Sequence, residues 1–372
     1  MHRILAFLVV FLLFETSYGQ TFQDTIPFRN DLGLIIIPIM FNGVEKEFAF
    51  DTGAEHSVAY GWAKESLQKT NKSITITSSS GLKSSMRFYK SGTIELGSRK
   101  IRGHRILNAQ ENEFFSCHQI DGILGVDIIK EFHWIIDYPN KRLIMYPTNF
   151  TPPQVKNMHE LHFTFHKNRP YVFLKRKENT FRFLLDTGAG GYSDLSKQNY
   201  NLTNLNDFEQ VSYYSGSIDV NGILTASQPK IFQLPEMSSK DVILEPVVSY
   251  NNQKSTKLGN KLWEGKQLFL SLKEDQLWIS ESKIKQSFAG YDCTVMYRKG
   301  KIKVTSIIVD SDPWKQGLRQ GDEVTRVNGK SFSDFCTLDQ YQRMLMKTEK
   351  PFDLELTNGK VVTVSLQKKF NP

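Results

Sequence analysis

The sequence predicts a mainly β protein in which two similar lobes precede a smaller C-terminal domain. Two observations predict the lobes. The tetrapeptide Asp-Thr-Gly-Ala occurs at 51–54 and again at 186–189, and short runs rich in Ile, Val, Phe and Tyr alternate with turn residues through both halves. The C-terminal domain is predicted because the repeat stops near residue 286 and a different strand and turn pattern begins. With 372 residues, 40% of them apolar, the chain is long enough for several domains.

The first twenty residues have the pattern of a signal peptide. A basic start precedes an unbroken apolar run at 4–14, and polar or small residues lead to a cleavage point after Gly19 or Gln20. The run is much shorter than the roughly 20 residues of a membrane helix, and no cysteine stands near the cut to carry a lipid. We therefore expect an exported protein, periplasmic or secreted, without a membrane span. A retained amphipathic anchor is the alternative.

Cysteine count and charge exclude two classes of protein. Three cysteines in an exported chain leave at least one unpaired, which excludes a disulfide scaffold. Cys293 and Cys336 could pair, but three inert thiols, with Cys117, are the simpler expectation. The net charge of +8 comes from Lys and Arg scattered along the chain without an aromatic-basic stripe, so we expect no nucleic-acid binding.

The repeat extends beyond the tetrapeptide. The two aspartates are 135 positions apart, and at this offset Ser80-Gly81 falls on Ser215-Gly216. At an offset of 134, Leu124-Gly125 falls on Leu258-Gly259, and the alignment continues without a gap through the next twenty or so residues. Two copies of one lobe therefore stand in tandem.

These observations set the domain boundaries. We predict a signal peptide at 1–20, lobe 1 at 21–150, lobe 2 at 151–284 and the C-terminal domain at 285–372. A proline-bearing linker at 146–157 separates the lobes. Short helical patterns at 60–69 and 125–132 interrupt the strands of lobe 1.

Asp-Thr-Gly at the end of an apolar strand is a sharp turn from which a carboxylate emerges, while Thr can hydrogen-bond locally and Gly permits close backbone approach. One copy usually means only a turn. Two copies at matched positions supply the two carboxylates that hydrolyse a peptide bond without a metal, one accepting a proton from water and one donating a proton to the carbonyl oxygen. Such a pair holds one proton over a wide acidic range, because like charges near contact cannot both ionise. We predict Asp51 and Asp186 as catalytic, supported by the loop residues Thr52, Gly53, Ala54, Thr187, Gly188 and Ala189.

The two motifs, each with a Leu-Gly 74 or 73 residues downstream, resemble the pepsin and retropepsin family of aspartic peptidases. The resemblance implies two β-barrel lobes that face each other across a cleft, with an apolar strand ending in Gly beneath each Asp loop. "IDGILG" at 120–125 matches that strand. Ala54 and Ala189 resemble the retroviral-like branch, whereas the tandem in one chain resembles pepsin. Lys257 departs from the pattern, since it stands where lobe 1 has Ile123, and predicts a less regular strand in lobe 2.

The resemblance also implies a mobile β-hairpin that closes the cleft. The candidates are Ser80 and Gly81 in lobe 1 and Ser215 and Gly216 in lobe 2, of which "TSSSGLKSSM" at 77–86 is the better match. Ordinary hairpin tips are the alternative.

The C-terminal pattern resembles a bacterial-type PDZ domain. Pro313, Gly317-Leu318, Gly321-Asp322 and Val327-Asn328-Gly329 follow in the order typical of that domain, before an amphipathic helix at 337–346 and a closing hairpin. PDZ domains commonly bind C-terminal peptides by adding a strand to a sheet edge. The segment 288–304 should hold the carboxylate-binding loop, yet it has no clear Gly-hydrophobic-Gly sequence. A purely structural role of the domain is the alternative.

Together these features predict an exported, monomeric aspartic endopeptidase whose PDZ domain tethers polypeptide substrates or partners, possibly through a C-terminal peptide ligand. Neither a metal nor an organic cofactor is implied, because His56, His118 and His133 lack zinc spacing and no serine-hydrolase or phosphate-loop motif occurs. The alternative is a non-catalytic binding clamp with a PDZ module. A working pH of about 4.5–6.5 is expected, because Ala54 and Ala189 offer no hydroxyl that could stabilise the ionised aspartates.

Overall fold

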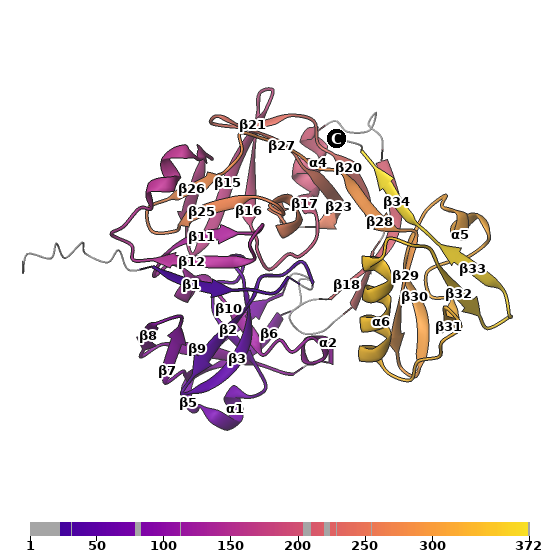
Figure 1. Cartoon of the computed structure of the whole chain (residues 1–372), viewed down its shortest axis with the longest axis horizontal. Helices are drawn as coiled ribbons and strands as arrows, with labels where there is room; N and C mark the ends of the chain where they lie inside the picture. Colours follow the sequence, from indigo (N-terminus) through magenta and orange to yellow (C-terminus); the bar gives the residue numbers. More distant parts are fainter. Residues whose placement is uncertain are drawn as a thin grey trace, which may run out of the picture.

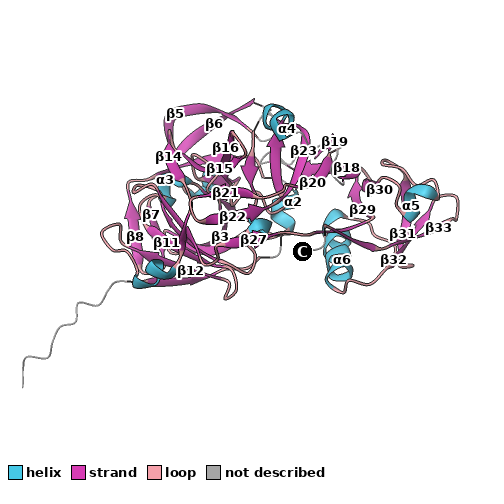
Figure 2. Cartoon of the chain, turned by 90° about the horizontal axis from the view of Figure 1, so that it is seen from above, coloured by secondary structure: helices cyan, strands magenta, loops and turns pink. Residues whose placement is uncertain are grey.

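The computed structural model describes residues 23–370 except 31, 79–82, 112, 204–209, 219–223, 228 and 254, so the predicted signal peptide lies outside the described residues. The described chain is mainly β, as predicted, and forms two lobes with a C-terminal domain beside them (Figures 1 and 2). No helix in these ranges is long and apolar enough to cross a membrane.

Lobe 1 is built around a sheet with the order β5-β6-β9-β4-β10-β3-β2-β7-β8. Of the helix expected at 60–69, only residues 63–66 are helical, because residues 68 and 69 already belong to a strand. The helix expected at 125–132 is a single turn at residues 126–129. The elements are β1 (Asp24–Pro27), β2 (Ile36–Phe41), β3 (Val44–Phe50), β4 (Val58–Tyr60), α1 (Ala63–Ser66), β5 (Gln68–Thr77), β6 (Lys83–Lys90), β7 (Thr93–Leu96), β8 (Arg99–Arg102), β9 (Arg105–Ala109), α2 (Glu113–Cys117), β10 (Gly122–Leu124), α3 (Val126–Ile129), β11 (His133–Asp137) and β12 (Arg142–Tyr146).

Lobe 2 repeats the pairing of an Asp-loop strand with a short parallel strand. The proline-bearing linker enters it through a 3₁₀ turn. Its elements are η1 (Pro153–Asn157), β13 (His159–Glu160), β14 (Phe163–His166), β15 (Arg169–Arg176), β16 (Asn179–Leu185), β17 (Ser193–Ser196), α4 (Lys197–Thr203), β18 (Gln210–Ile218), β19 (Leu224–Ser227), β20 (Lys230–Gln233), β21 (Met237–Ser239), β22 (Val242–Glu245), β23 (Val247–Gln253), β24 (Lys257–Leu258), η3 (Asn260–Leu262), β25 (Gln267–Ser271), β26 (Gln276–Ile279) and β27 (Lys283–Lys285).

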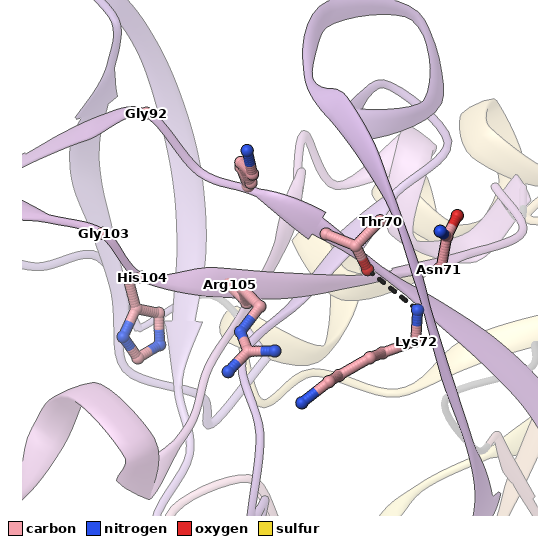
Figure 3. A pocket seen from close by; sticks show the side chains of 8 residues that line it. Thr70, Asn71, Lys72, Gly92, Gly103, His104 and Arg105 are labelled. Carbon is pink, nitrogen blue, oxygen red and sulfur yellow. Dashed lines mark hydrogen bonds between the residues drawn. The ribbon is translucent and has the colours of Figure 1, made fainter.

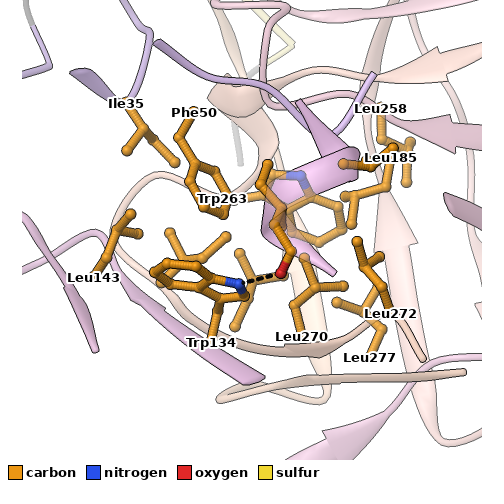
Figure 4. Packing of buried hydrophobic residues seen from close by; sticks show 14 of the residues in the cluster. Ile35, Phe50, Trp134, Leu143, Leu185, Leu258, Trp263, Leu270, Leu272 and Leu277 are labelled. Atoms are coloured by element: carbon orange, nitrogen blue, oxygen red, sulfur yellow. Dashed lines mark hydrogen bonds between the residues drawn. The ribbon is translucent and has the colours of Figure 1, made fainter. Parts of the chain in front are cut away.

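A sheet shared by both lobes, with the order β1-β12-β11-β25-β26-β13, joins them. At its centre β11 and β25 run antiparallel, and Ile135 lies opposite Phe269. These two residues are 134 positions apart, the offset of the sequence repeat, so the local two-fold axis passes between them. The core beneath this sheet draws on both lobes, and Figure 4 shows Trp134 and Trp263 together with Phe50 and Leu185. The strands that carry the two Asp-Thr-Gly loops thus end on one continuous apolar base.

The C-terminal domain is a small α+β unit with its own core. Its helix α6 packs on β29. The elements are β28 (Phe288–Tyr291), β29 (Cys293–Arg298), β30 (Lys301–Ile308), α5 (Asp312–Lys315), β31 (Glu323–Val327), α6 (Phe335–Lys347), β32 (Phe352–Leu356), β33 (Val361–Val364) and β34 (Leu366–Lys369).

A disulfide attaches the C-terminal domain to lobe 1. Cys117 at the end of α2 is bonded to Cys336 at the start of α6, with 5.4 Å between their Cα atoms, and Cys293 is buried and free. The expectation of three unpaired thiols is therefore wrong, and so is the alternative pairing of Cys293 with Cys336. Sequence spacing could not reveal the bond, because its partners are 219 residues apart and meet only through domain packing. Beside it His118 Nε2 lies 3.0 Å from Asp339 Oδ2.

A second attachment joins the C-terminal domain to lobe 2. Strand β18 pairs antiparallel with β30, with Tyr213 opposite Ile308 and Tyr214 opposite Ile307 (Figure 1). The C-terminal domain therefore contacts both lobes, through a helix on one side and through a sheet on the other.

Candidate active site

The two Asp-Thr-Gly loops begin where two equivalent strands end. Asp51 follows β3, and its amide donates to the carbonyl of Leu124 at 2.9 Å. Asp186 follows β16, and its amide donates to the carbonyl of Leu258 at 3.1 Å. Strand β10 runs parallel to β3, and β24 runs parallel to β16 in the equivalent register. The predicted strand beneath each loop is thus present in both lobes, and Lys257 occupies the second one without shifting its register.

The two loops are tied to each other through their threonines. The amide of Thr52 donates to Oγ1 of Thr187 at 2.9 Å, and the amide of Thr187 donates to Oγ1 of Thr52 at 3.1 Å. Each hydroxyl also donates to a carbonyl of the opposite strand, Thr52 to Leu185 at 2.6 Å and Thr187 to Phe50 at 2.7 Å. Both threonines are fully buried. The prediction that they bond locally is wrong, because each one bonds across the two-fold axis.

The glycines bring the carboxyl groups close together. A β-carbon placed on Gly53 would lie 2.5 Å from Oδ1 of Asp186, and one placed on Gly188 would lie 2.3 Å from the carboxyl carbon of Asp51. Only glycine leaves room for the opposite aspartate at these positions. Each carboxyl group therefore lies against the loop of the other lobe, as two groups acting on one substrate atom require.

The environment of Asp51 favours its protonated form. Burial, followed by the charge of Asp186, raises the pKa of Asp51 to about 7. The hydrogen bonds from the amides of Gly53 and Ala54 and the charge of Lys257 act in the opposite direction and lower this pKa. The two amides donate to Oδ1 of Asp51 at 2.8 and 3.1 Å. The direction agrees with the expected working pH nearer neutral. The largest cause is burial, however, and not the hydroxyl that is missing at residue 54.

Two charged residues near the dyad were not predicted as part of the site. Lys257 Nζ lies 3.2 Å from Oδ2 of Asp186 and 3.6 Å from Oδ2 of Asp194 on β17. Burial lowers the pKa of Lys257, but the charges of Asp186 and Asp194 outweigh it and the net pKa is raised. Burial also raises the pKa of Asp194, against the attraction of Lys257. The available sequence signal was the lysine in an otherwise apolar strand.

The flap candidates fall in two different settings. Ser80 and Gly81 lie outside the described residues, between strands β5 and β6, which pair up to Thr77 and Lys83. Ser215 and Gly216 lie within strand β18, opposite Ser227 and Ala226 of β19. The lobe 2 pair therefore belongs to the arm of a hairpin rather than to its tip, and the two preceding residues of the same strand pair with β30 of the C-terminal domain.

A surface pocket of about 590 Å³ lies on lobe 1, where Thr70, Lys72, His104 and Arg105 line it (Figure 3). None of its lining residues belongs to an Asp loop. In the described residues no three His, Cys, Asp or Glu side chains are placed to hold a metal ion.

Comparison with protein families agrees with this geometry. Residues 37–128, which include the first Asp loop and strand β10, match the aspartyl protease family model, and residues 278–357 match the PDZ domain model. The chain contains an aspartyl protease domain and a PDZ domain. Both resemblances predicted from the sequence are confirmed, whereas the catalytic roles of Asp51 and Asp186 stay predictions. A comparison with curated proteins finds no match for the chain.

The PDZ domain has a closed sheet edge. On β29, the amide of Val295 donates to Oε1 of Gln342 at 2.9 Å, and Nε2 of Gln342 donates back to the carbonyl of Val295 at 3.2 Å. Gln342 belongs to α6, so its side chain takes the hydrogen bonds that an added peptide strand would make. Asp292 is the single residue between β28 and β29, its carboxylate accepts a hydrogen bond from the amide of Ser365 at 3.0 Å, and burial raises its pKa. The predicted carboxylate-binding loop has no room between these two strands.

Proposed function

We propose that the protein is an exported, monomeric aspartic endopeptidase in which Asp51 and Asp186 activate a water molecule for attack on a peptide bond. The observation that carries the proposal is the reciprocal contact of the two Asp loops, with each carboxyl group lying over the glycine of the other loop. The aspartyl protease match supports it for the first lobe, and the equivalent register of β24 extends the argument to the second.

The arrangement supports a complete hydrolytic cycle. One carboxylate accepts a proton from water as the water oxygen bonds to the peptide carbon, while the other carboxyl group gives its proton to the carbonyl oxygen. The tetrahedral intermediate then breaks its C–N bond. The leaving nitrogen takes a proton from the first carboxyl group, and the second group regains the proton of the hydroxyl. Both groups return to their starting state, so water is the only other reactant.

The direct test uses the purified mature chain. Incubation with a mixed protein substrate from pH 3 to 8 should give internal cleavage that a statine-type inhibitor stops and that the Asp51→Asn variant lacks. Binding of substrate without cleavage at any pH would support the non-catalytic clamp instead.

The PDZ domain has two candidate roles. As a tether it would bind polypeptide and raise the local concentration of protein substrates. In a purely structural role, the PDZ domain would be fixed to the two lobes and would hold the β18–β19 hairpin in place through β30. The disulfide to lobe 1 and the closed edge at Gln342 favour the fixed role, since strand addition on β29 requires Gln342 to leave. Cleavage of short peptides compared with whole proteins separates the two roles.

A further inference from the structure

Lys257 is a partly buried cation that breaks the two-fold symmetry of the dyad. Its side chain is 16% exposed, and its Nζ lies 3.2 Å from the Asp186 carboxylate. The equivalent residue in lobe 1 is Ile123, which occupies the same register on β10 opposite the strand that carries Asp51. One aspartate of the pair thus has a cation in hydrogen-bonding range, and the other has an apolar side chain at the matching position.

The partners of the two carboxylates differ accordingly. Asp51 accepts hydrogen bonds from two uncharged amides, those of Gly53 and Ala54. Among the described residues, Lys257 provides the charged contact of Asp186. A cation in contact with a carboxylate favours its ionised form, and does so more strongly than an uncharged donor. When the dyad holds one proton, that proton is therefore more stable on Asp51 than on Asp186.

We propose that Lys257 is a positioning residue that assigns the two catalytic roles, keeping Asp186 ionised as the base toward water and leaving the shared proton on Asp51 as the acid. The proposal rests on the proposed endopeptidase function and deepens it. Three carboxyl groups face the ammonium, those of Asp51 at the end of β3, Asp186 at the end of β16 and Asp194 on β17.

Asp194 has a defined part in this arrangement. It lies 3.6 Å from Lys257 and is not in either Asp-Thr-Gly loop. When Asp186 accepts the proton from water it becomes neutral, and Lys257 loses the charge of its nearest carboxylate. Asp194, when ionised, is the second carboxylate in contact with the ammonium and keeps it paired at this step.

The test compares Lys257→Met with Lys257→Arg by the pH profile of kcat/KM on a short peptide. Loss of the cation should move the acid limb of the profile upward by about 1 to 3 pH units. The alkaline limb, which reports Asp51, should move less, and Lys257→Arg should keep the acid limb near the wild-type position. Lys240→Met, which removes an exposed lysine of the same lobe, is the matched control. A pH profile of folded Lys257→Met that does not differ from that of the wild type would overturn the proposal. Higher activity of this variant at every pH would also overturn it, because Lys257 would then inhibit the site.

A second measurement does not depend on hydrolysis. If the wild-type chain neither cleaves substrate nor binds a statine-type inhibitor, the proposed function fails. Thermal unfolding then still tests whether Lys257 stabilises the ionised carboxylate of Asp186. Without the ammonium, the carboxylates of Asp186 and Asp194 lose their positive partner, and this loss destabilises the folded state only at a pH where they are ionised. Lys257→Met should therefore lower Tm more at pH 8 than at pH 4. An equal decrease at both pH values would show that Lys257 does not hold Asp186 ionised.

Discussion

The hydroxyl of Thr52 accepts a hydrogen bond from the amide of Thr187, and the hydroxyl of Thr187 accepts one from the amide of Thr52. The two Asp loops are therefore not independent turns that happen to meet. Each loop completes the hydrogen bonding of the other, and the carbonyl groups of Phe50 and Leu185 are satisfied in the same exchange. We therefore expect a substitution at either threonine to affect the positions of both aspartates.

Thr52→Val should destabilise the protein because it leaves the amide of Thr187 and the carbonyl of Leu185 buried without partners. Each unsatisfied group costs about 1 to 3 kcal/mol, so for the two groups we expect a loss of about 2 to 6 kcal/mol in the free energy of unfolding. Thr52→Ser keeps the hydroxyl and should retain most of the stability. Equal urea midpoints for Thr52→Val and the wild type would contradict the structural role of the exchange.

Asp51→Asn and Asp186→Asn should each lower kcat by about 10²- to 10⁴-fold or more while the protein stays folded, because each substitution removes one of the two groups proposed to transfer protons. The control is Asp241→Asn, which removes an exposed carboxylate that pairs with His159. The control variant should cleave like the wild type. Full activity of either dyad variant in a peptide cleavage assay would exclude the dyad.

Asp51→Asn should also change how stability depends on pH. In the wild type the pKa of Asp51 is about 7, above its ordinary value of 3.8, so the folded state binds more protons than the unfolded state between these values. The contribution of Asp51 to stability is therefore present at low pH and lost as the pH rises toward 7. Asparagine does not titrate, so Tm of the variant minus Tm of the wild type should be larger at pH 8 than at pH 4. A difference independent of pH would show that Asp51 has an ordinary pKa.

Loss of the Cys117–Cys336 disulfide should destabilise the whole chain. The bond closes a segment of 219 residues, and disulfides typically contribute about 2 to 5 kcal/mol. We expect the Cys117→Ser, Cys336→Ser double variant to have a lower Tm, and dithiothreitol to lower the Tm of the wild type toward the same value. Because Cys293 is the remaining thiol, dithiothreitol should not affect the double variant. A Tm unaffected by both treatments would mean that domain packing alone holds α6.

The parts of this site that could be predicted from the sequence lie in short motifs that occur twice in the chain. Asp51 and Asp186 end apolar strands in the same short motif, and a motif repeated at one offset implies a two-fold arrangement of its carboxyl groups. The PDZ turns are likewise marked by short runs of apolar and turn residues.

The parts that could not be predicted depend on contacts between distant segments. The exchange between Thr52 and Thr187 looks like two local turns until the lobes face each other. Lys257 could be identified as an exception to an apolar strand, but its carboxylate partners are set by the position of β17 relative to β24. The bond of Cys117 to Cys336 depends on how α2 meets α6, and nothing in either helix specifies that contact alone.

Gln342→Ala should increase peptide binding by the PDZ domain if β29 is a binding edge closed by that side chain. The substitution frees the amide and carbonyl of Val295, which Gln342 now occupies, and two competing hydrogen bonds correspond to about tenfold or more in affinity. A labelled mixture of short peptides, measured by fluorescence polarisation, should bind the variant better than the wild type. Gln340→Ala, which truncates an exposed glutamine of the same helix, is the control. Because Asp292 alone separates β28 from β29 and leaves no loop there to hold a carboxylate, peptides with free and with amidated C-termini should bind alike. If the folded Gln342→Ala variant gains no affinity for peptides, a purely structural role of the PDZ domain is favoured. That outcome also predicts that deleting the chain from about Gln286 lowers the cleavage of short peptides and of whole proteins equally.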